Sequence, residues 1–304
     1  MDLSELKNCN LCPRKCGVNR LDINSGSKGF CNAAGETIRI GRAALHYYEE
    51  PCISGESGSG AVFFSGCSLR CDFCQNSSLS REFSGADVDI SRLAEIFFEL
   101  KEKGANNINL ITPTHYTTQI REAIKISRRK GFDLPFVWNS SGYELSRTLR
   151  TLDGLIDIWL PDFKYLSSET AGKYSKAKDY PEYAKSAIKE MVRQCPTPEF
   201  SYNGIMKKGV IIRHLLLPGQ LEQSKRVIEY LHKEYGNSIY LSIMSQYTPQ
   251  ESSTLEELKN PVPYSEYEEL VDFAMLIGVE NGFIQEEGSA DDSFIPVFNG
   301  EGVI

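Results

Sequence analysis

The chain has 304 residues, of which 41% are hydrophobic and 24% are charged, and its formal net charge is −8. This length suffices for one large α/β domain with a small appendage. The acidic charge argues against nucleic acid as a partner, since the only tight basic run is RRK at 128–130. The opening sequence MDLSELKNCN has no apolar segment and no apolar run reaches bilayer length, so we expect a cytoplasmic protein with no membrane partner.

The first cysteine group lies near the start of the chain, in the runs CNLCPRKC and GFC. The short CxxC spacing and a turn at Pro13 place sulfurs on one side of a loop, so four thiols can converge on one ion. We predict a metal-binding segment over residues 1–54 that holds either zinc or an auxiliary iron–sulfur cluster, because both accept four thiolates. Its predicted ligands are Cys9, Cys12, Cys16 and Cys31.

Two further cysteines, Cys52 and Cys195, fit no group and are predicted to pack as small apolar side chains. For Cys52, two alternatives are replacement of an N-terminal ligand and donation of a hydrogen atom near the site. The glycines Gly55, Gly58 and Gly60 predict a turn that leads into the first strand.

From residue 61, short apolar strands alternate with amphipathic helices, which is typical of a parallel sheet built from βαβ units. We predict an α/β fold over residues 55–304, a partial (β/α)6 TIM-like barrel with parallel strands, in addition to the small N-terminal cysteine-rich module. The sixth helix is predicted to open with a capping box of Ser265 and Glu268 and to close at Gly278. The predicted strands are Val62–Ser65, Asn107–Thr112, Pro135–Asn139, Leu155–Pro161, Gly209–Leu217 and Ile239–Ser245.

The second cysteine group directly follows the first predicted strand, in the run FFSGCSLRCDFCQN. Cys67, Cys71 and Cys74 have CxxxCxxC spacing, and Phe73 precedes the last thiol. A cubane cluster normally takes four thiolates, so three of them leave one iron open for chemistry. The alternative is a structural metal loop that takes a fourth ligand from elsewhere in the chain.

This motif resembles the CxxxCxΦC motif, with Φ aromatic, of the radical S-adenosylmethionine (radical SAM) enzymes. The longer run EEPCISGESGSGAVFFSGCSLRCDFCQN is similar to the PflX type, which is pyruvate formate-lyase-activating-enzyme-like. The resemblance implies a [4Fe–4S] cluster on Cys67, Cys71 and Cys74 that is covered by Phe73, with S-adenosyl-L-methionine bound to the free iron. It also implies an oxidoreductase that takes electrons from flavodoxin or ferredoxin and cleaves the cofactor to a 5′-deoxyadenosyl radical.

By the same resemblance, the radical abstracts hydrogen from a glycine of a partner glycyl-radical enzyme. One alternative is a radical SAM enzyme that acts on another protein, a peptide or a small molecule. An alternative of another class is a non-catalytic iron–sulfur electron carrier, which would not need a barrel cavity. The N-terminal cysteine module is a departure from the plain activating enzymes.

Residues just past each strand are candidates for the cofactor site, because active sites of such barrels collect at the carboxyl ends of the strands. Thr114 and His115 stand where the family has a GGE-type motif, and a Thr hydroxyl can accept a hydrogen bond from the cofactor ammonium. Alternatively, both residues lie in the turn that leads into the next helix. Asn139 and Ser141, in WNSSGY, stand where activating enzymes carry a DTNG-like turn.

The fourth and fifth strands end in charged motifs. PDFK is similar to the family's D-x-K and implies that Asp162 and Lys164 contact the methionine end of the cofactor, with a surface salt bridge as the alternative. RHLLLPG resembles R-x-x-x-x-P-G and implies that Arg213 binds a carboxylate or the ribose. Strand alternation directs His214 to the opposite face.

The sixth strand ends in SIMSQYTP, where Met244 and Gln246 are predicted to line the adenine and ribose pocket. Filling of the barrel is the alternative for Met244. Two long segments rich in Tyr, Ser and Lys, Tyr165–Pro181 and Pro196–Lys208, are predicted as loops after the fourth and fifth strands and as the substrate-recognition surface.

Overall fold

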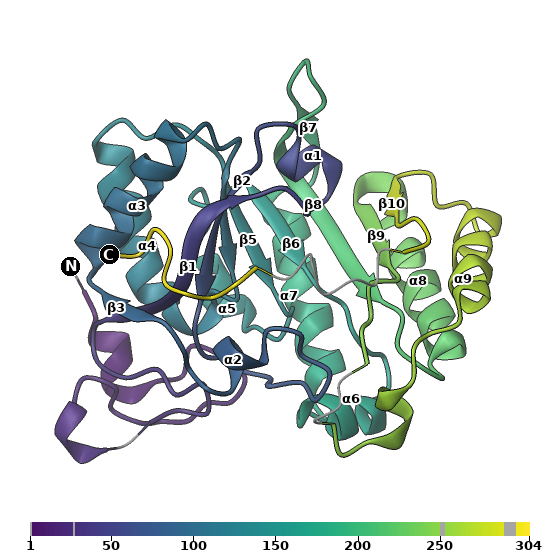
Figure 1. Cartoon of the computed structure of the whole chain (residues 1–304), viewed down its shortest axis with the longest axis horizontal. Helices are drawn as coiled ribbons and strands as arrows, with labels where there is room; N and C mark the ends of the chain where they lie inside the picture. The colour runs from purple at the N-terminus through teal and green to yellow at the C-terminus, as the bar shows by residue number, and fades with distance from the viewer. Residues whose placement is uncertain (1, 27, 250–252, 289–295) are drawn as a thin grey trace.

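The structure is a computed structural model that describes residues 2–26, 28–249, 253–288 and 296–304. Its centre is one curved sheet with the strand order β10-β9-β8-β6-β5-β4-β2-β1-β3 (Figure 1). Six consecutive pairings from β2 to β10 are parallel, whereas β1 pairs antiparallel with both β2 and β3. In the described part of the chain, no helix is long and apolar enough to cross a membrane.

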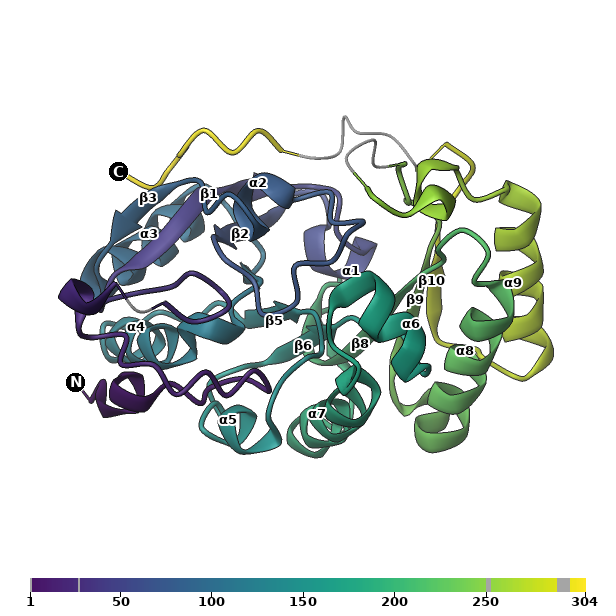
Figure 2. The same ribbon diagram turned by 90° about the horizontal axis from the view of Figure 1, so that it is seen from below.

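The strands have the following bounds: β1 Ile38–His46, β2 Ser59–Phe64, β3 Ala86–Val88, β4 Ile108–Ile111, β5 Phe136–Ser140, β6 Ile158–Pro161, β7 Glu199–Phe200, β8 Met206–Leu215, β9 Tyr240–Met244 and β10 Gly282–Ile284. The helices are α1 Pro51–Ser54, α2 Ser77–Ser80, α3 Ile90–Glu102, α4 Thr117–Arg129, α5 Ser146–Arg150, α6 Ser168–Ser175, α7 Tyr180–Gln194, α8 Leu221–Tyr235 and α9 Tyr264–Leu276. In Figure 2, α4, α5 and α7 lie along one side of the sheet and the N-terminal segment lies beside α4 and α5.

Local sequence explains where helix α3 begins and ends. Asp89 caps α3, because its carboxylate accepts a hydrogen bond from the Arg92 backbone N–H. Apolar residues recur at helical spacing along α3 and are buried against the sheet. Gly104 follows with φ +92°, a conformation that lets the chain leave the helix without strain.

Strand alternation divides the barrel interior into two layers. Val137, Ile158 and Ile211 point inward at the amino end, where they form a buried apolar cluster. Two residues further along their strands, Asn139 and Arg213 line a cavity at the carboxyl end. The apolar layer therefore fills the amino end of the barrel and forms its floor, and the polar cavity lies at the carboxyl end.

The predicted fold class is confirmed. The six predicted strands correspond to β2, β4, β5, β6, β8 and β9, and the structure adds β1 and β3 at one edge and β10 at the other. The predicted segment 1–54 thus contains β1, which belongs to the sheet. The added strand β10 has only three residues, too few to show a period in sequence.

The predicted capping box of the sixth helix is wrong. Helix α9 begins at Tyr264 with Pro263 at its N-cap and has no side-chain cap, so Ser265 already lies inside the helix. A proline lacks the backbone N–H that a longer helix would need and restricts the residue before it, so the helix begins after Pro263. Its N-cap lies two residues earlier than the Ser–Glu spacing predicts. The predicted end is confirmed, since Gly278 has φ +96° just after the helix.

Residues 296–304 return across the sheet to β1 (Figure 1). The Ala43 backbone N–H donates to the Glu301 carbonyl at 2.8 Å, and the Phe298 ring lies 5.3 Å from that of Phe63 in β2. Val303 is fully buried. This returning segment therefore covers the antiparallel edge of the sheet.

Candidate functional site

The three predicted cluster ligands lie in the loop that follows β2. Cys67, Cys71 and Cys74 all line one cavity of about 230 Å³. The loop is tightly turned, with Arg70 at φ +57° and the Cys74 backbone N–H donating to the Cys71 carbonyl at 3.2 Å. Phe73 is buried and lies in the same wall.

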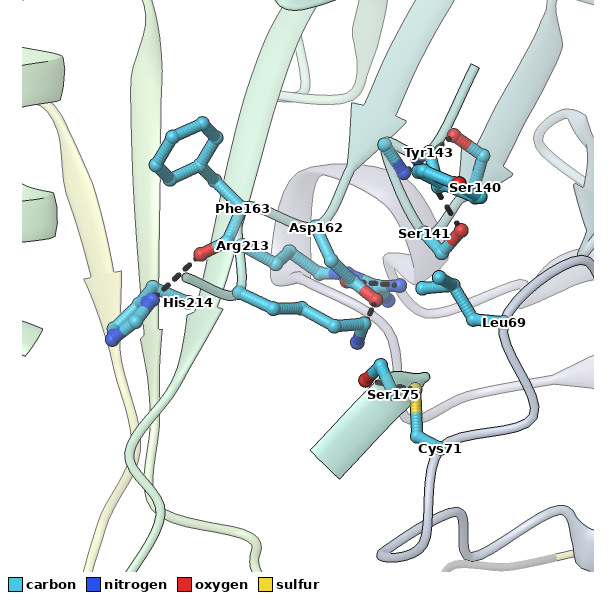
Figure 3. A network of polar contacts seen from close by, with 12 residues as sticks. Leu69, Cys71, Ser140, Ser141, Tyr143, Asp162, Phe163, Ser175, Arg213 and His214 are labelled. Carbon is cyan, nitrogen blue, oxygen red and sulfur yellow. Dashed lines mark hydrogen bonds and ion pairs between the residues drawn. The ribbon is translucent and has the colours of Figure 1, made fainter. Parts of the chain in front are cut away.

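Each of the three sulfurs has at least one hydrogen-bond donor. The Leu69 backbone N–H donates to Cys67 Sγ at 3.3 Å, and the Ser80 hydroxyl donates to Cys74 Sγ at 3.4 Å. The Ser175 hydroxyl at the end of α6 donates to Cys71 Sγ at 2.9 Å (Figure 3). Donors to the ligating sulfurs are one of the features that set the potential of an iron–sulfur cluster.

Burial opposes ionisation of the thiols in this loop. Burial raises the pKa of Cys71 to about 12, although the Lys164 ammonium lowers it in part. Burial likewise raises the pKa of Cys67. A thiolate is the form that binds iron, so a cluster bound here would supply the positive charge that stabilises the ionised thiols.

In the residues that the structure describes, no three His, Cys, Asp or Glu side chains are arranged to hold a single metal ion. A cubane differs from a single ion, because each thiolate binds its own iron and the sulfurs need not meet at one point. Three thiols with three donors on one cavity wall fit such a cluster.

The cavity brings together most of the predicted cofactor residues. It lies at the carboxyl ends of the parallel strands, as expected for this architecture. The predicted residues on its wall, besides the three cysteines, are Phe73, Asn139, Ser141, Asp162, Lys164, Arg213, Met244 and Gln246. His214 is not among them; it is buried on the other face, where its Nδ1 contacts the Phe163 carbonyl at 2.7 Å, so the predicted alternation is confirmed (Figure 3).

An ionic network occupies the part of the cavity wall formed by the carboxyl ends of β6 and β8. Asp162 lies between Lys164 Nζ, at 2.7 Å, and the Arg213 guanidinium, at 3.0 Å. Burial opposes ionisation of Asp162, but the two cations outweigh it and lower its pKa. The Lys164 Nζ also lies 5.6 Å from the centre of the Phe73 ring, so one ammonium connects the carboxylate to the cysteine loop. The two side chains are only about 15% exposed, which excludes the predicted alternative of a surface salt bridge.

Glu49 is a site residue that the sequence analysis missed. Its carboxylate accepts hydrogen bonds from the Asn109 and Asn139 amides and pairs with Arg213 at 3.2 Å. Burial raises the pKa of Glu49, while Arg213 lowers it in part. The only sequence signal was the pair of acidic residues before Pro51, a segment that lies between β1 and α1 and far from the predicted strands.

Each of the three nitrogens of the Arg213 guanidinium has a hydrogen-bond partner. Its Nε donates to Asp162 at 3.0 Å, its Nη1 to Glu49 at 3.2 Å and its Nη2 to the Asn139 side-chain oxygen at 2.6 Å. A guanidinium has five N–H donors, so it can still donate to a further ligand oxygen. Its first effect, however, is to fix the two carboxylates in the cavity.

Thr114 and His115 do not lie on the cavity wall; Thr112 lies there instead. The Thr114 hydroxyl donates to buried Glu144 at 3.0 Å, and His115 Nε2 contacts the Ser65 carbonyl at 2.8 Å. Burial lowers the pKa of His115 to about 3, so the ring is neutral. Both residues form the short 3-10 turn that precedes α4, which is the alternative placement given above.

The four N-terminal cysteines lie near one another. A Cβ on Gly29 would lie 3.6 Å from Cys16 Sγ and 3.7 Å from Cys31 Sγ, so these two sulfurs flank one residue. Burial raises the pKa of Cys12 to about 12, and the nearby thiols of Cys31, Cys9 and Cys16 add to the increase. The thiols are therefore neighbours, but in the described residues no three of them are arranged to hold one metal ion.

Cys52 and Cys195 pack as predicted. Cys52 belongs to the apolar floor of the barrel, together with Ile53 and Met206. Cys195 is buried after α7, with its thiol 3.4 Å from the Asp157 carbonyl.

The two predicted recognition loops are wrong as loops. Tyr165–Pro181 contains α6, whose last residue reaches Cys71. Pro196–Lys208 contains β7 and the first residues of β8, and these two strands form a hairpin at the amino end of the barrel. Pro196–Lys208 is therefore remote from the cavity. The Tyr- and Ser-rich composition of the two segments belongs to the surfaces of a helix and a hairpin.

A barrel-like parallel sheet with a three-thiol loop over a charged cavity defines the class of the protein. The family model for the radical SAM superfamily matches residues 61–258, and the chain belongs to that family. An uncharacterized protein of Methanocaldococcus jannaschii, MJ0674, is 26% identical over 279 residues, which cover 88% of this chain and 74% of that protein.

Among solved structures, Streptococcus suis SuiB is similar with a TM-score of 0.50 and 13% identity, over 75% of this chain and 48% of SuiB. The structure of SuiB bound to its precursor peptide SuiA is similar to the same degree, with a TM-score of 0.50 and 13% identity, over 72% of this chain and 46% of SuiB. The chain thus spans about half the length of SuiB, and this likeness concerns the fold.

Proposed function

We propose that this protein reductively cleaves S-adenosyl-L-methionine at a [4Fe–4S] cluster held by Cys67, Cys71 and Cys74. The observation that carries the proposal is one cavity lined by three thiols, each with its own hydrogen-bond donor, and by a buried ionic network. When bound, the cluster supplies the single electron that splits the sulfonium into methionine and a 5′-deoxyadenosyl radical.

The residues of the chain bind and orient the cofactor. Lys164 supplies a positive charge for the methionine carboxylate, and Asp162 balances that charge while holding the ammonium side. Arg213 fixes Asp162 and Glu49, so both carboxylates keep one orientation. Met244 and Gln246 line the opposite part of the cavity, where the adenine and ribose would lie.

The substrate of this proposal is a glycine Cα–H in a partner glycyl-radical enzyme. Support comes from the similarity of the run that ends in the cysteine loop to the PflX type. The related fold of SuiB, whose structure was solved with a precursor peptide, is consistent with a polypeptide substrate. A flavodoxin or ferredoxin would supply the electron.

The test is anaerobic incubation of the reconstituted protein with dithionite and S-adenosyl-L-methionine, followed by chromatography for 5′-deoxyadenosine. Substitution of Cys71 by Ala should abolish the product, whereas Cys195→Ala, which lies outside the cavity, should retain it. An intact cluster without 5′-deoxyadenosine would favour the electron-carrier alternative. Electron paramagnetic resonance of a candidate partner would then test for an organic radical that depends on this protein.

We further propose that Cys9, Cys12, Cys16 and Cys31 bind a second metal, either zinc or an auxiliary iron–sulfur cluster. Metal analysis of a variant that lacks Cys67, Cys71 and Cys74 separates the two: residual zinc indicates a structural ion, and residual iron with sulfide indicates a cluster. No bound metal in that variant would refute the proposal.

A further inference from the structure

The part of the N-terminal segment that carries its four cysteines, from Cys9 to Cys31, packs against the cluster-binding loop. We call this part the module below. Gly66, which precedes Cys67, has φ +92°, and a Cβ there would lie 2.3 Å from the Cys31 carbonyl oxygen. No side chain separates the two cysteine groups at this point. A change in the backbone around Cys31 is therefore transmitted to the residue next to a cluster ligand.

Arg14 connects the module to the loop from a second direction. It lies between Cys12 and Cys16, and its Nε donates to the Ser68 carbonyl at 2.7 Å. Its Nη2 donates to the Ser175 carbonyl at 3.3 Å, and its Nη1 donates to the next carbonyl along the chain at 2.7 Å. The rigid fork of a guanidinium can hold these two segments at fixed separation, which a lysine cannot do.

The Arg14 side chain is itself held in place. Its guanidinium carbon lies 4.0 Å from the centre of the Phe30 ring, which belongs to the same module. It also lies 5.3 Å from the Tyr143 ring. Aromatic faces attract a guanidinium, so the orientation of Arg14 depends on the folded module.

Ser175 links Arg14 to the cluster ligand. It is fully buried at the end of α6, and its hydroxyl donates to Cys71 Sγ at 2.9 Å. The next residue, Lys176, has φ +53°, so the chain turns sharply there and the two Arg14 contacts hold that turn. Arg14 therefore fixes the backbone that carries this hydroxyl, and the hydroxyl itself also bonds to the Tyr165 hydroxyl at 2.9 Å.

A second arginine, Arg20, supports the part of the loop that precedes Cys67. Arg20 is 1% exposed, and its Nη1 donates to the His115 carbonyl at 2.6 Å. His115 in turn contacts the Ser65 carbonyl, two residues before Cys67. The module thus holds the loop on both sides of Cys67.

We infer that the N-terminal module tunes the cluster at Cys67, Cys71 and Cys74, and that Arg14 is the positioning residue that transmits its state through Ser175 to Cys71. The inference rests on the proposed function, because it requires a cluster at that site. A hydrogen bond to a ligating sulfur stabilises the reduced cluster, which carries one more negative charge. Loss of Arg14 frees the backbone that carries Ser175, which weakens the hydrogen bond to Cys71 and lowers the reduction potential.

If the module has only a structural role, a different result is expected. In that case removal of Arg14 lowers the stability of the protein or its iron content but leaves the potential of the remaining clusters unchanged. The potential therefore separates tuning from simple docking.

The experiment is a dithionite titration of the reconstituted full chain, with the reduced cluster followed by electron paramagnetic resonance. Arg14→Gln and Ser175→Ala should each lower the reduced-to-oxidised ratio at a fixed potential by about tenfold, which is 59 mV for one electron. Because both act on one hydrogen bond, the double variant should shift no further than either single variant.

Arg147→Gln is the matched control. Arg147 also joins the module, through its Nη2 to the Asn10 carbonyl at 2.9 Å, but it does not contact the cysteine loop. The reduction potential of the cluster in Arg147→Gln should equal that in the wild type. If Arg14→Gln fails to load iron, Arg14→Lys serves instead, since it keeps the charge but loses the fork, and the same lowered potential is expected.

Two results overturn the inference. One is a wild-type potential in Arg14→Gln or Arg14→Lys with full iron content, and the other is additive shifts of Arg14→Gln and Ser175→Ala. A wild-type protein without a reducible cluster would refute the proposed function as well, so the two failures are distinguishable.

Discussion

Replacement of Arg213 by methionine tests whether one guanidinium holds the buried charges of the cavity together. Arg213, Asp162 and Glu49 have side chains that are 15%, 15% and 10% exposed, so the substitution leaves two carboxylates in a largely water-free setting. Removal of one partner from a buried ion pair typically costs 3–5 kcal/mol. Asp162 retains Lys164 at 2.7 Å, which places the expected loss near the lower end, at about 3 kcal/mol.

Glu49 should carry most of this loss. Burial already raises the pKa of Glu49 in the presence of Arg213, and without the guanidinium that pKa rises further. A carboxyl whose folded pKa exceeds its unfolded value favours the folded state less as pH increases, so the cost should be smaller at pH 5 than at pH 8. The double variant Arg213→Met/Glu49→Gln removes the unpaired charge and should recover about 1–2 kcal/mol.

The assay is urea unfolding under anaerobic conditions, followed by the fluorescence of Trp138 and Trp159, which are both fully buried. Arg150→Met is the control, because Arg150 is 63% exposed and its partner Glu190 keeps Arg193. It should cost less than about 1 kcal/mol. A loss below about 1 kcal/mol for Arg213→Met, or no recovery in the double variant, would refute this account of the cavity.

Three further predictions follow from single contacts. Gly66→Ala should reduce the iron content after reconstitution, because its Cβ would lie 2.3 Å from the Cys31 carbonyl; wild-type iron content would contradict the close contact. Burial lowers the pKa of His214 to about 4, so below pH 6.5 the unfolded chain binds a proton that the folded chain does not. The free energy of unfolding should therefore fall with decreasing pH by up to about 1.4 kcal/mol per unit, and this slope should be shallower in His214→Gln when urea curves at pH 5.5 and 7.5 are compared. Gly302→Ala would place a Cβ 2.0 Å from the Ala43 carbonyl and should expose the returning segment to protease, whereas unchanged cleavage would show that the segment can shift without loss.

The sequence was sufficient to predict the barrel and the cluster loop because both are encoded locally. The alternation of apolar strands with helices is visible within windows of about 15 residues. The spacing of Cys67, Cys71 and Cys74 is likewise complete within eight residues of the chain. The motif similarity also placed Asp162, Lys164 and Arg213 on the cavity wall, where the structure has them.

Other features depend on contacts between distant segments, and the sequence could not show them. Glu49 becomes a cavity residue only because β1 pairs antiparallel with β2 and turns back beneath the site. Ser175 reaches Cys71 across 104 positions, from a segment whose composition favoured a loop. Thr114 was predicted from its place after a strand, but Glu144 holds its hydroxyl away from the cavity.

The return of residues 296–303 to β1 has a consequence for the order of events during synthesis. The cysteine loop leaves the ribosome more than 220 residues before Phe298 can meet Phe63 and Val303 can be buried. Until then the edge of the nascent sheet is uncovered beside the place where iron must be delivered. If metal is loaded before the last residues are released, the edge of the sheet beside the cysteine loop is still uncovered at that time.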